Sequence, residues 1–237
     1  MKRASLVALA LTVVACSGEP LPPVAKPTPS GSGAPATAAS AEPAPAPPAF
    51  RLPTTVAPRK VAATLTLVPA EDTFRGAVDI ELTLAQASRV LWLNATKLEV
   101  SEAHIEVNGE KRTARILPGG EHFVGFAFDT EIPAGPARLS ATYTGQISNA
   151  DDRGVFREKE GDDAFLFSQF ENIEARRAFP CVDEPSIKIP WQLTLRVKAA
   201  DTALSNTPVL DEKVDADGWK TVRFAETKPL PSYLVAF

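Results

Sequence analysis

Hydrophobic and polar positions alternate with a period of two along most of the chain after residue 60. The clearest case is residues 78–84, Val-Asp-Ile-Glu-Leu-Thr-Leu, in which every second side chain is apolar. This period places the apolar side chains on one face of a β-strand, whereas an amphipathic helix repeats every 3.6 residues. Further strands rich in Val, Leu, Ile, Thr and Phe are expected at residues 64–68, 90–93, 98–107, 122–128, 138–144, 165–170, 192–197, 221–224 and 233–237.

Turn residues separate these segments. Asn108-Gly109 directly follows residues 105–107 and predicts a hairpin with a type I′ turn, since that turn needs positive φ at both central positions. The longest helical candidate covers only residues 174–178. Short strands at intervals of about eight to twelve residues predict an all-β fold, an antiparallel β-sandwich or barrel, without revealing which strands pair.

The strand at residues 165–170 differs from the others because it is apolar on both faces at its start, so we expect it to be buried on both. Alternation places Phe165, Phe167, Gln169 and Glu171 on one face. Gln169 and Glu171 would then lie about 6.6 Å apart and point the same way. Either the two polar groups reach one ligand, or the strand emerges into solvent there; spacing alone favours the second.

The N-terminus has the pattern of an export signal. Lys2 and Arg3 precede an apolar run over residues 4–15, which is shorter than the roughly 20 residues that a membrane-spanning helix needs. The run ends in Val-Val-Ala-Cys, which resembles a bacterial lipobox, with Cys16 as the residue that receives the lipid. The alternative is an ordinary secretory signal with an incidental cysteine. Ser17 stands where an Asp would favour retention in the inner membrane, so we expect an outer-membrane anchor facing the periplasm.

A stretch rich in Pro and Ala follows. Residues 17–49 consist largely of Pro, Ala, Ser, Gly and Thr and contain no aromatic residue. Such a segment buries too little apolar surface to offset its ordering entropy and is expected to be a disordered, rather stiff tether. The predicted organisation is a signal peptide at residues 1–15, a tether at 16–49 and one folded domain at 50–237.

Several classes of function are disfavoured. The formal net charge of −4 does not suit nucleic acid, whose binding needs clustered Lys and Arg. The two histidines, His104 and His122, lack the spacing of a zinc-binding H-E-x-x-H, so no metal ligand and no cofactor are expected in this chain. Motifs of serine hydrolases and nucleotide-binding loops do not occur in the folded region. Cys181 is expected to be a free, buried cysteine, and the chain alone should not catalyse.

Two motifs lie close together after residue 165: Phe-Ser-Gln-Phe-Glu at residues 167–171 and Ala-Arg-Arg-Ala-Phe-Pro-Cys-Val-Asp-Glu-Pro at 175–185. They resemble the signature of the aminopeptidase N family of zinc peptidases, the gluzincins. Residues 203–208 and 233–237 match the family in the same order, and residues 91–95 and 154–157 fit more loosely. The similarity covers roughly residues 61–237.

The resemblance implies a saddle-like N-terminal β-sandwich that packs against a C-terminal zinc catalytic domain of the same protein. In that family a Gln-x-Glu pair binds the free α-amino group of a peptide, which implies a substrate-binding role for Gln169 and Glu171. The complete enzyme would use zinc and act on peptide N-termini. Four charged residues of the motif are expected to be structural and to pair with one another or close a loop: Arg176, Arg177, Asp183 and Glu184.

The chain also departs from the family pattern. The family's Gly-x-Met-Glu-Asn loop needs a methionine, and Met1 is the only one here; H-E-x-x-H is absent as well. The sequence stops at Phe237 within a hydrophobic segment, so we expect a protein truncated before its catalytic half and inactive by itself. The competing functions are a non-catalytic peptide- or protein-binding surface lipoprotein and a purely structural envelope lipoprotein.

Overall fold

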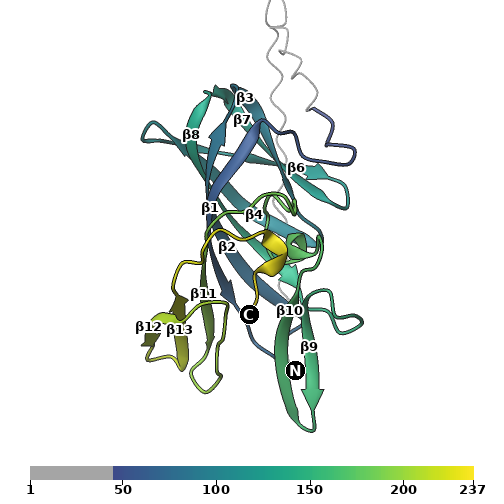
Figure 1. Ribbon diagram of the computed structural model, residues 1–237, viewed down its shortest axis with the longest axis vertical. Helices are drawn as coiled ribbons and strands as arrows, with labels where there is room; N and C mark the ends of the chain where they lie inside the picture. The colour runs from purple at the N-terminus through teal and green to yellow at the C-terminus, as the bar shows by residue number, and fades with distance from the viewer. Residues whose placement is uncertain (1–44) are drawn as a thin grey trace, which may run out of the picture. The chain divides into compact units, whose positions relative to one another are not determined.

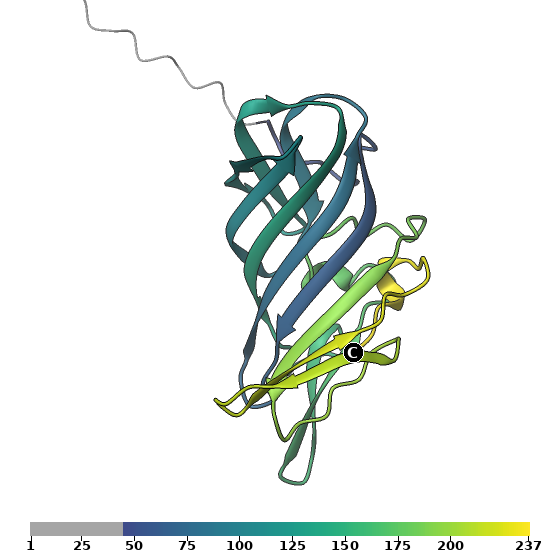
Figure 2. The same cartoon turned by 90° about the vertical axis from the view of Figure 1, so that its left-hand side faces the viewer.

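A computed structural model of the protein describes residues 45–237. Its largest element is an eight-stranded sheet whose neighbouring strands are antiparallel, except for the parallel pair β1 and β11 (Figure 2). In order across the sheet the strands are β12 (Val209–Val214), β13 (Trp219–Phe224), β11 (Trp191–Lys198), β1 (Val56–Thr66), β2 (Thr73–Leu84), β8 (Gly135–Gln146), β4 (Leu98–Val107) and β5 (Glu110–Thr113).

Two smaller sheets complete the domain (Figure 1). One has three strands, in the order β3 (Ser88–Asn94), β7 (Phe123–Ile132) and β6 (Arg115–Gly119). The other is a two-stranded hairpin of β9 (Gly154–Glu160) and β10 (Asp163–Gln169). Two single-turn 3-10 helices lie outside the sheets: η1 (Ala175–Arg177) follows β10, and η2 (Ser232–Leu234) follows β13.

One hydrophobic core joins the eight-stranded and the three-stranded sheets. On β2 every second side chain is buried, with Ile80 and Leu82 at most 2% exposed. They belong to the same cluster as Leu91 of β3 and Phe126 of β7, which are 1% and 0% exposed. The inner faces of the two sheets are therefore buried against each other, by alternation on β2 and by continuous buried runs on β3 and β7. The predicted all-β sandwich is confirmed.

Most of the expected strands are present, with informative differences. The Asn108-Gly109 turn between β4 and β5 has φ of 52° and 77°, as the type I′ prediction requires, and residues 174–178 contain η1. The first strand starts at Val56, well before residue 64. β5, β6, β9 and β12 were not predicted; β12, Val-Leu-Asp-Glu-Lys-Val, is exposed throughout and so lacks the apolar alternation of a half-buried strand.

The strand predicted at residues 233–237 is wrong. Residues 232–234 form η2, and residues 235–237 have no strand partner. Side chains take the place of a neighbouring strand here, because Asn206 bonds to the carbonyl of Leu234 and to the amide of Ala236. Apolar composition alone could not distinguish this arrangement from a sheet strand.

The predicted signal peptide and Cys16 lie outside the described residues, and the predicted tether is described only at residues 45–49, which have no helix or strand. Among residues 45–237, no helix has the length and apolar character to cross a membrane.

A glycine on β2 permits the cross-strand packing that links the large sheet to the loop after η1. The Tyr143 ring lies over Gly76, so that a Cβ added there would come within 2.2 Å of it. The buried Tyr143 hydroxyl donates a 2.7 Å hydrogen bond to the carbonyl of Ala178, just after η1. Gly76 therefore provides the space through which β8 contacts the loop after η1.

We predict that Gly76→Ala destabilises the domain by about 1–3 kcal/mol, because the new methyl group must displace a buried ring. Urea unfolding followed by circular dichroism measures the change. The exposed neighbour Arg75 provides the control, since Arg75→Ala should alter stability by only about 0.5 kcal/mol or less. Equal stability of the Gly76→Ala variant and the parent would show that the Tyr143 ring does not depend on the absence of a side chain at position 76.

Candidate functional site

Gln169 and Glu171 lie where β10 ends. Gln169 is the last residue of the strand, and Glu171 belongs to the turn that leads to η1. The buried Phe170 ring between them packs against Phe179, with centroids 5.8 Å apart. The Oε1 atom of Gln169 accepts a 3.0 Å hydrogen bond from the backbone N–H of Glu171, and the Glu171–Asn172 peptide bond is cis. Both polar side chains are exposed.

This arrangement corrects two expectations about the strand. Phe165 and Phe167 are 44% and 46% exposed, so β10 is not buried on both faces. The reason is that β10 pairs only with β9, and the other described residues cover the face that carries these rings only in part. Glu171 also lies beyond the strand, so the backbone turn, and not strand alternation, sets its direction.

A buried ion pair anchors the segment that follows the turn. Arg176 donates from Nε to the Oδ2 atom of Asp183 at 2.9 Å and from Nη2 to the Asp183 carbonyl at 3.0 Å. The backbone N–H of Arg176 also donates to Oδ2, at 3.2 Å. The Asp183 side chain is 0% exposed and that of Arg176 is 11% exposed. This confirms the expected structural pairing for these two residues.

Two distant segments close the network around Asp183. The Ser232 hydroxyl of η2 donates to Oδ1 at 2.5 Å, and the Asn94 side chain at the end of β3 accepts the Asp183 N–H at 3.0 Å. Asn94 and Cys181 also exchange backbone hydrogen bonds of 2.8 and 3.1 Å. We call these four residues, Asn94, Arg176, Asp183 and Ser232, the polar anchor. Asn94 and Ser232 were not predicted, because their partners lie 89 and 49 residues away.

Arg177 pairs outside the four charged motif residues and helps to close a loop, which is the second of the two expected arrangements. Its Nε atom lies 2.5 Å from Glu174, and its Nη1 atom lies 3.9 Å from Asp151 in the loop before β9. A Cβ on Gly154 would lie 2.8 Å from the Arg177 side chain, so that loop and η1 approach closely. Arg177 thus ties the turn carrying Glu171 to the start of the hairpin.

Arg157 on β9 holds the hairpin against the large sheet. Its guanidinium donates to the carbonyls of Pro69 and Glu71 and to the side chains of Asp72 and Asn149. The hydrogen bond from Arg157, followed by that from Asn149, lowers the pKa of the Asp72 carboxyl below its ordinary value. Residues 154–157 match the family only loosely, and a charged residue in a polar segment gives no sequence signal of a role in positioning the hairpin.

The side chains of this region do not fit a metal. Among the residues that the structure describes, no group of three or more His, Cys, Asp or Glu side chains could hold a metal ion. His122 lies 3.4 Å from the Thr96 hydroxyl, whereas His104 lies on β4. Burial of the ring, followed by the charge of Lys111, lowers the pKa of His104. Cys181 is free and buried, as predicted.

Comparison with known proteins places this arrangement in context. Residues 57–234 match the family model of the Peptidase M1 N-terminal domain. Aminopeptidase M1-D of Oryza sativa subsp. japonica is 35% identical over 190 residues, which cover 78% of this chain and 22% of that protein. Aminopeptidase M1 of Arabidopsis thaliana is 32% identical with the same coverage, and the puromycin-sensitive aminopeptidase of Caenorhabditis elegans is 33% identical over 196 residues. The chain therefore spans about a fifth of the length of these relatives.

Burial of Cys181 generates a prediction about alkaline pH. Desolvation, followed by the nearby charge of Asp183, raises the pKa of its thiol well above the ordinary value. The unfolded thiol ionises at about pH 8.5 while the folded one stays protonated. Burial of the neutral thiol therefore makes its full contribution to the stability of the domain below that pH, and this contribution is lost as pH rises. Stability should fall by about 1.4 kcal/mol per pH unit above about pH 8.5.

Urea unfolding between pH 7 and 10 tests this in a Cys16→Ser background, with Cys181→Ala as the matched variant. The difference in stability between the two proteins should shrink as pH rises. A pH-independent difference would mean that the native thiol ionises as readily as the unfolded one. Measurements stop at pH 10 because burial also raises the pKa of Tyr143. Above that pH, ionisation of the unfolded tyrosine would lower the stability of the domain as well.

Proposed function

The chain belongs to the peptidase M1 N-terminal domain family, and on that premise we propose that it is the substrate-recognition domain of a membrane-anchored zinc aminopeptidase. The complete enzyme removes N-terminal residues from peptides. The observation that carries the proposal is the exposed Glu171 carboxylate, held beside Gln169 in a turn that the polar anchor fixes.

The chemistry of Glu171 suits a peptide amine. An exopeptidase must recognise the ammonium group at the chain end, and a carboxylate accepts a short charge-assisted hydrogen bond from it. The Gln169 amide oxygen already accepts the Glu171 N–H, which orients the turn, and it keeps a second lone pair for the same ammonium. An acceptor pair at a fixed place sets the distance between the peptide's first residue and the reacting bond.

The remaining chemistry belongs to polypeptide outside residues 45–237. Because no described group fits a metal, zinc and the water that it activates come from the catalytic domain of the same protein in this proposal. Glu171 is exposed, which is consistent with a site formed jointly by this domain and the catalytic domain, since a residue of such a site must lie at the surface of its own domain. By itself the chain binds and orients, and we propose that it is inactive.

We predict that Glu171→Ala in the complete enzyme lowers kcat/KM for aminoacyl-dye substrates by about 100-fold, which corresponds to a few kcal/mol for a lost charge contact at the amine. Glu160→Ala at the end of β9 removes an exposed carboxylate from the same hairpin and should leave kcat/KM unchanged. Equal kcat/KM for Glu171→Ala and wild type would remove Glu171 from the site. A complete protein with no chelator-sensitive turnover would instead favour a non-catalytic binding lipoprotein.

The anchor is a separate part of the proposal. The lipobox-like Val-Val-Ala-Cys supports lipid attachment at Cys16 after removal of residues 1–15, and Ser17 supports an outer-membrane position facing the periplasm. The Pro- and Ala-rich residues 16–49 would hold the domain away from the bilayer.

Cys16→Ser should therefore abolish labelling with radioactive palmitate and shift the protein from the membrane to the soluble fraction. Cys181→Ser is the matched control, because it removes the other cysteine and should keep the label. Undiminished labelling of Cys16→Ser would contradict the anchor and leave the peptidase proposal intact.

A further inference from the structure

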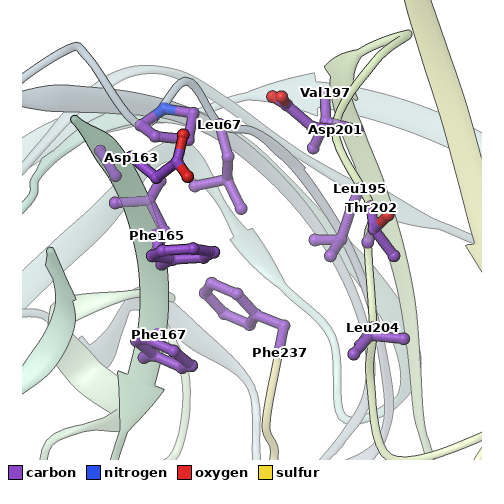
Figure 3. A pocket seen from close by; sticks show the side chains of 14 residues that line it. Leu67, Asp163, Phe165, Phe167, Leu195, Val197, Asp201, Thr202, Leu204 and Phe237 are labelled. Atoms are coloured by element: carbon purple, nitrogen blue, oxygen red, sulfur yellow. The ribbon is translucent and has the colours of Figure 1, made fainter. Parts of the chain in front are cut away.

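An apolar cleft of about 680 Å³ lies between β10 and the segment around β11. Phe165 and Phe167 line one side, and Leu195 and Leu204 line the other, with the Phe237 ring pointing into the space between them (Figure 3). In Figure 1 the same two walls are the β9–β10 hairpin and the β11–β13 strands, which flank the C-terminus.

The walls of this cleft are unusually exposed for large apolar side chains. Phe165, Phe167 and Leu204 are 44%, 46% and 72% exposed. The two phenylalanine rings stack with centroids 6.5 Å apart, so they present one continuous apolar surface. Contiguous apolar surface of this kind marks a contact with another part of a protein or with a partner.

The end of the chain already enters the cleft in an extended form. Ser168 of β10 accepts a 2.9 Å hydrogen bond from the Phe237 N–H and donates to the Phe237 carbonyl at 3.2 Å. On the opposite side Ser205 donates to the Ala236 carbonyl at 2.8 Å. Side chains from both walls therefore hold the backbone of residues 236–237 between them.

β10 also has a free edge, because β9 is its only neighbour in the hairpin sheet. Phe237 lies at the level of Ser168, and the cleft continues along β10 to Asp163. Polypeptide entering from Phe237 would thus run against the direction of β10, as the opposed ribbons in Figure 3 show. Covering residues 163–167 takes about five extended residues, or roughly 17 Å.

We propose that in the complete protein the residues directly after Phe237 fill this cleft as a third strand, antiparallel to β10. This rests on the proposed function, in which the polypeptide continues past Phe237. The chain covers about a fifth of the length of its relatives, so those proteins are long enough to contain such a segment. The strand is apolar at the positions that face Phe165, Phe167 and Leu204, and its backbone pairs with the free edge of β10. It fixes the hairpin whose end carries Gln169 and Glu171.

Hydrogen exchange followed by mass spectrometry tests the inference on the 237-residue chain and on the complete protein. The β10 amides that do not bond to β9 should exchange at least about 100-fold more slowly in the complete protein. Phe167→Asp should abolish that protection and change little in the 237-residue chain, where the ring is already 46% exposed. Leu210→Asp on β12, at a side chain 58% exposed and outside the cleft, should affect neither protein.

Equal exchange of these amides in both proteins would overturn the strand, even in an enzyme that is fully active. Protection of β10 in a complete protein without peptidase activity would keep the strand and refute the proposed function. A 237-residue chain that sediments as a dimer, and as a monomer after Phe167→Asp, would show that a second copy fills the cleft, which also overturns the inference. So would a gene without codons after Phe237.

Discussion

The buried ion pair between Arg176 and Asp183 is the interaction on which the functional region depends. Removing two charges from water is costly, and such a pair is tolerated only when the remaining donors and acceptors are satisfied. Here Oδ2 of Asp183 accepts from the Arg176 side chain and amide, Oδ1 accepts from Ser232, and Asn94 accepts the Asp183 N–H. Through its carboxylate and its backbone N–H, Asp183 thereby joins η1, η2 and the end of β3, three segments far apart in the sequence.

The turn that carries Glu171 is supported from both sides. After it, the polar anchor holds η1, and the Tyr143 hydroxyl, reaching past Gly76, holds the carbonyl of Ala178. Before it, Arg157 fixes the hairpin to the connection between β1 and β2. A carboxylate can be exposed and still be well positioned when the backbone on either side of it is fixed, and this is the property that recognition of a peptide amine requires.

The sequence predicted the fold class and the family well, because both depend on local signals. The alternation of β2 follows from burial of one face, and the Asn108-Gly109 turn from the φ angles that only such residues adopt readily. Prediction from the sequence failed where contacts between distant segments determine the structure. Phe165 and Phe167 are apolar yet exposed. Residues 233–237 are apolar, yet side chains and not a neighbouring strand hold them. Ser232 has a structural role only because it bonds to Asp183, 49 residues away. The family resemblance, and not the spacing, pointed to Gln169 and Glu171, and the end of β10 sets the geometry of this pair.

We infer that the polar anchor, more than the sandwich as a whole, holds the turn in place. Native-state hydrogen exchange of the Asp183→Asn variant checks this, because the isosteric amide removes the charge that pairs with Arg176. The amides of Glu174, Phe179 and Thr96, which bond within and to this region, should exchange at least about tenfold faster than in the parent, while those of Ile80 and Leu139 in the large sheet stay equally slow. Unchanged protection of the first three amides, or equal acceleration at all five, would contradict it.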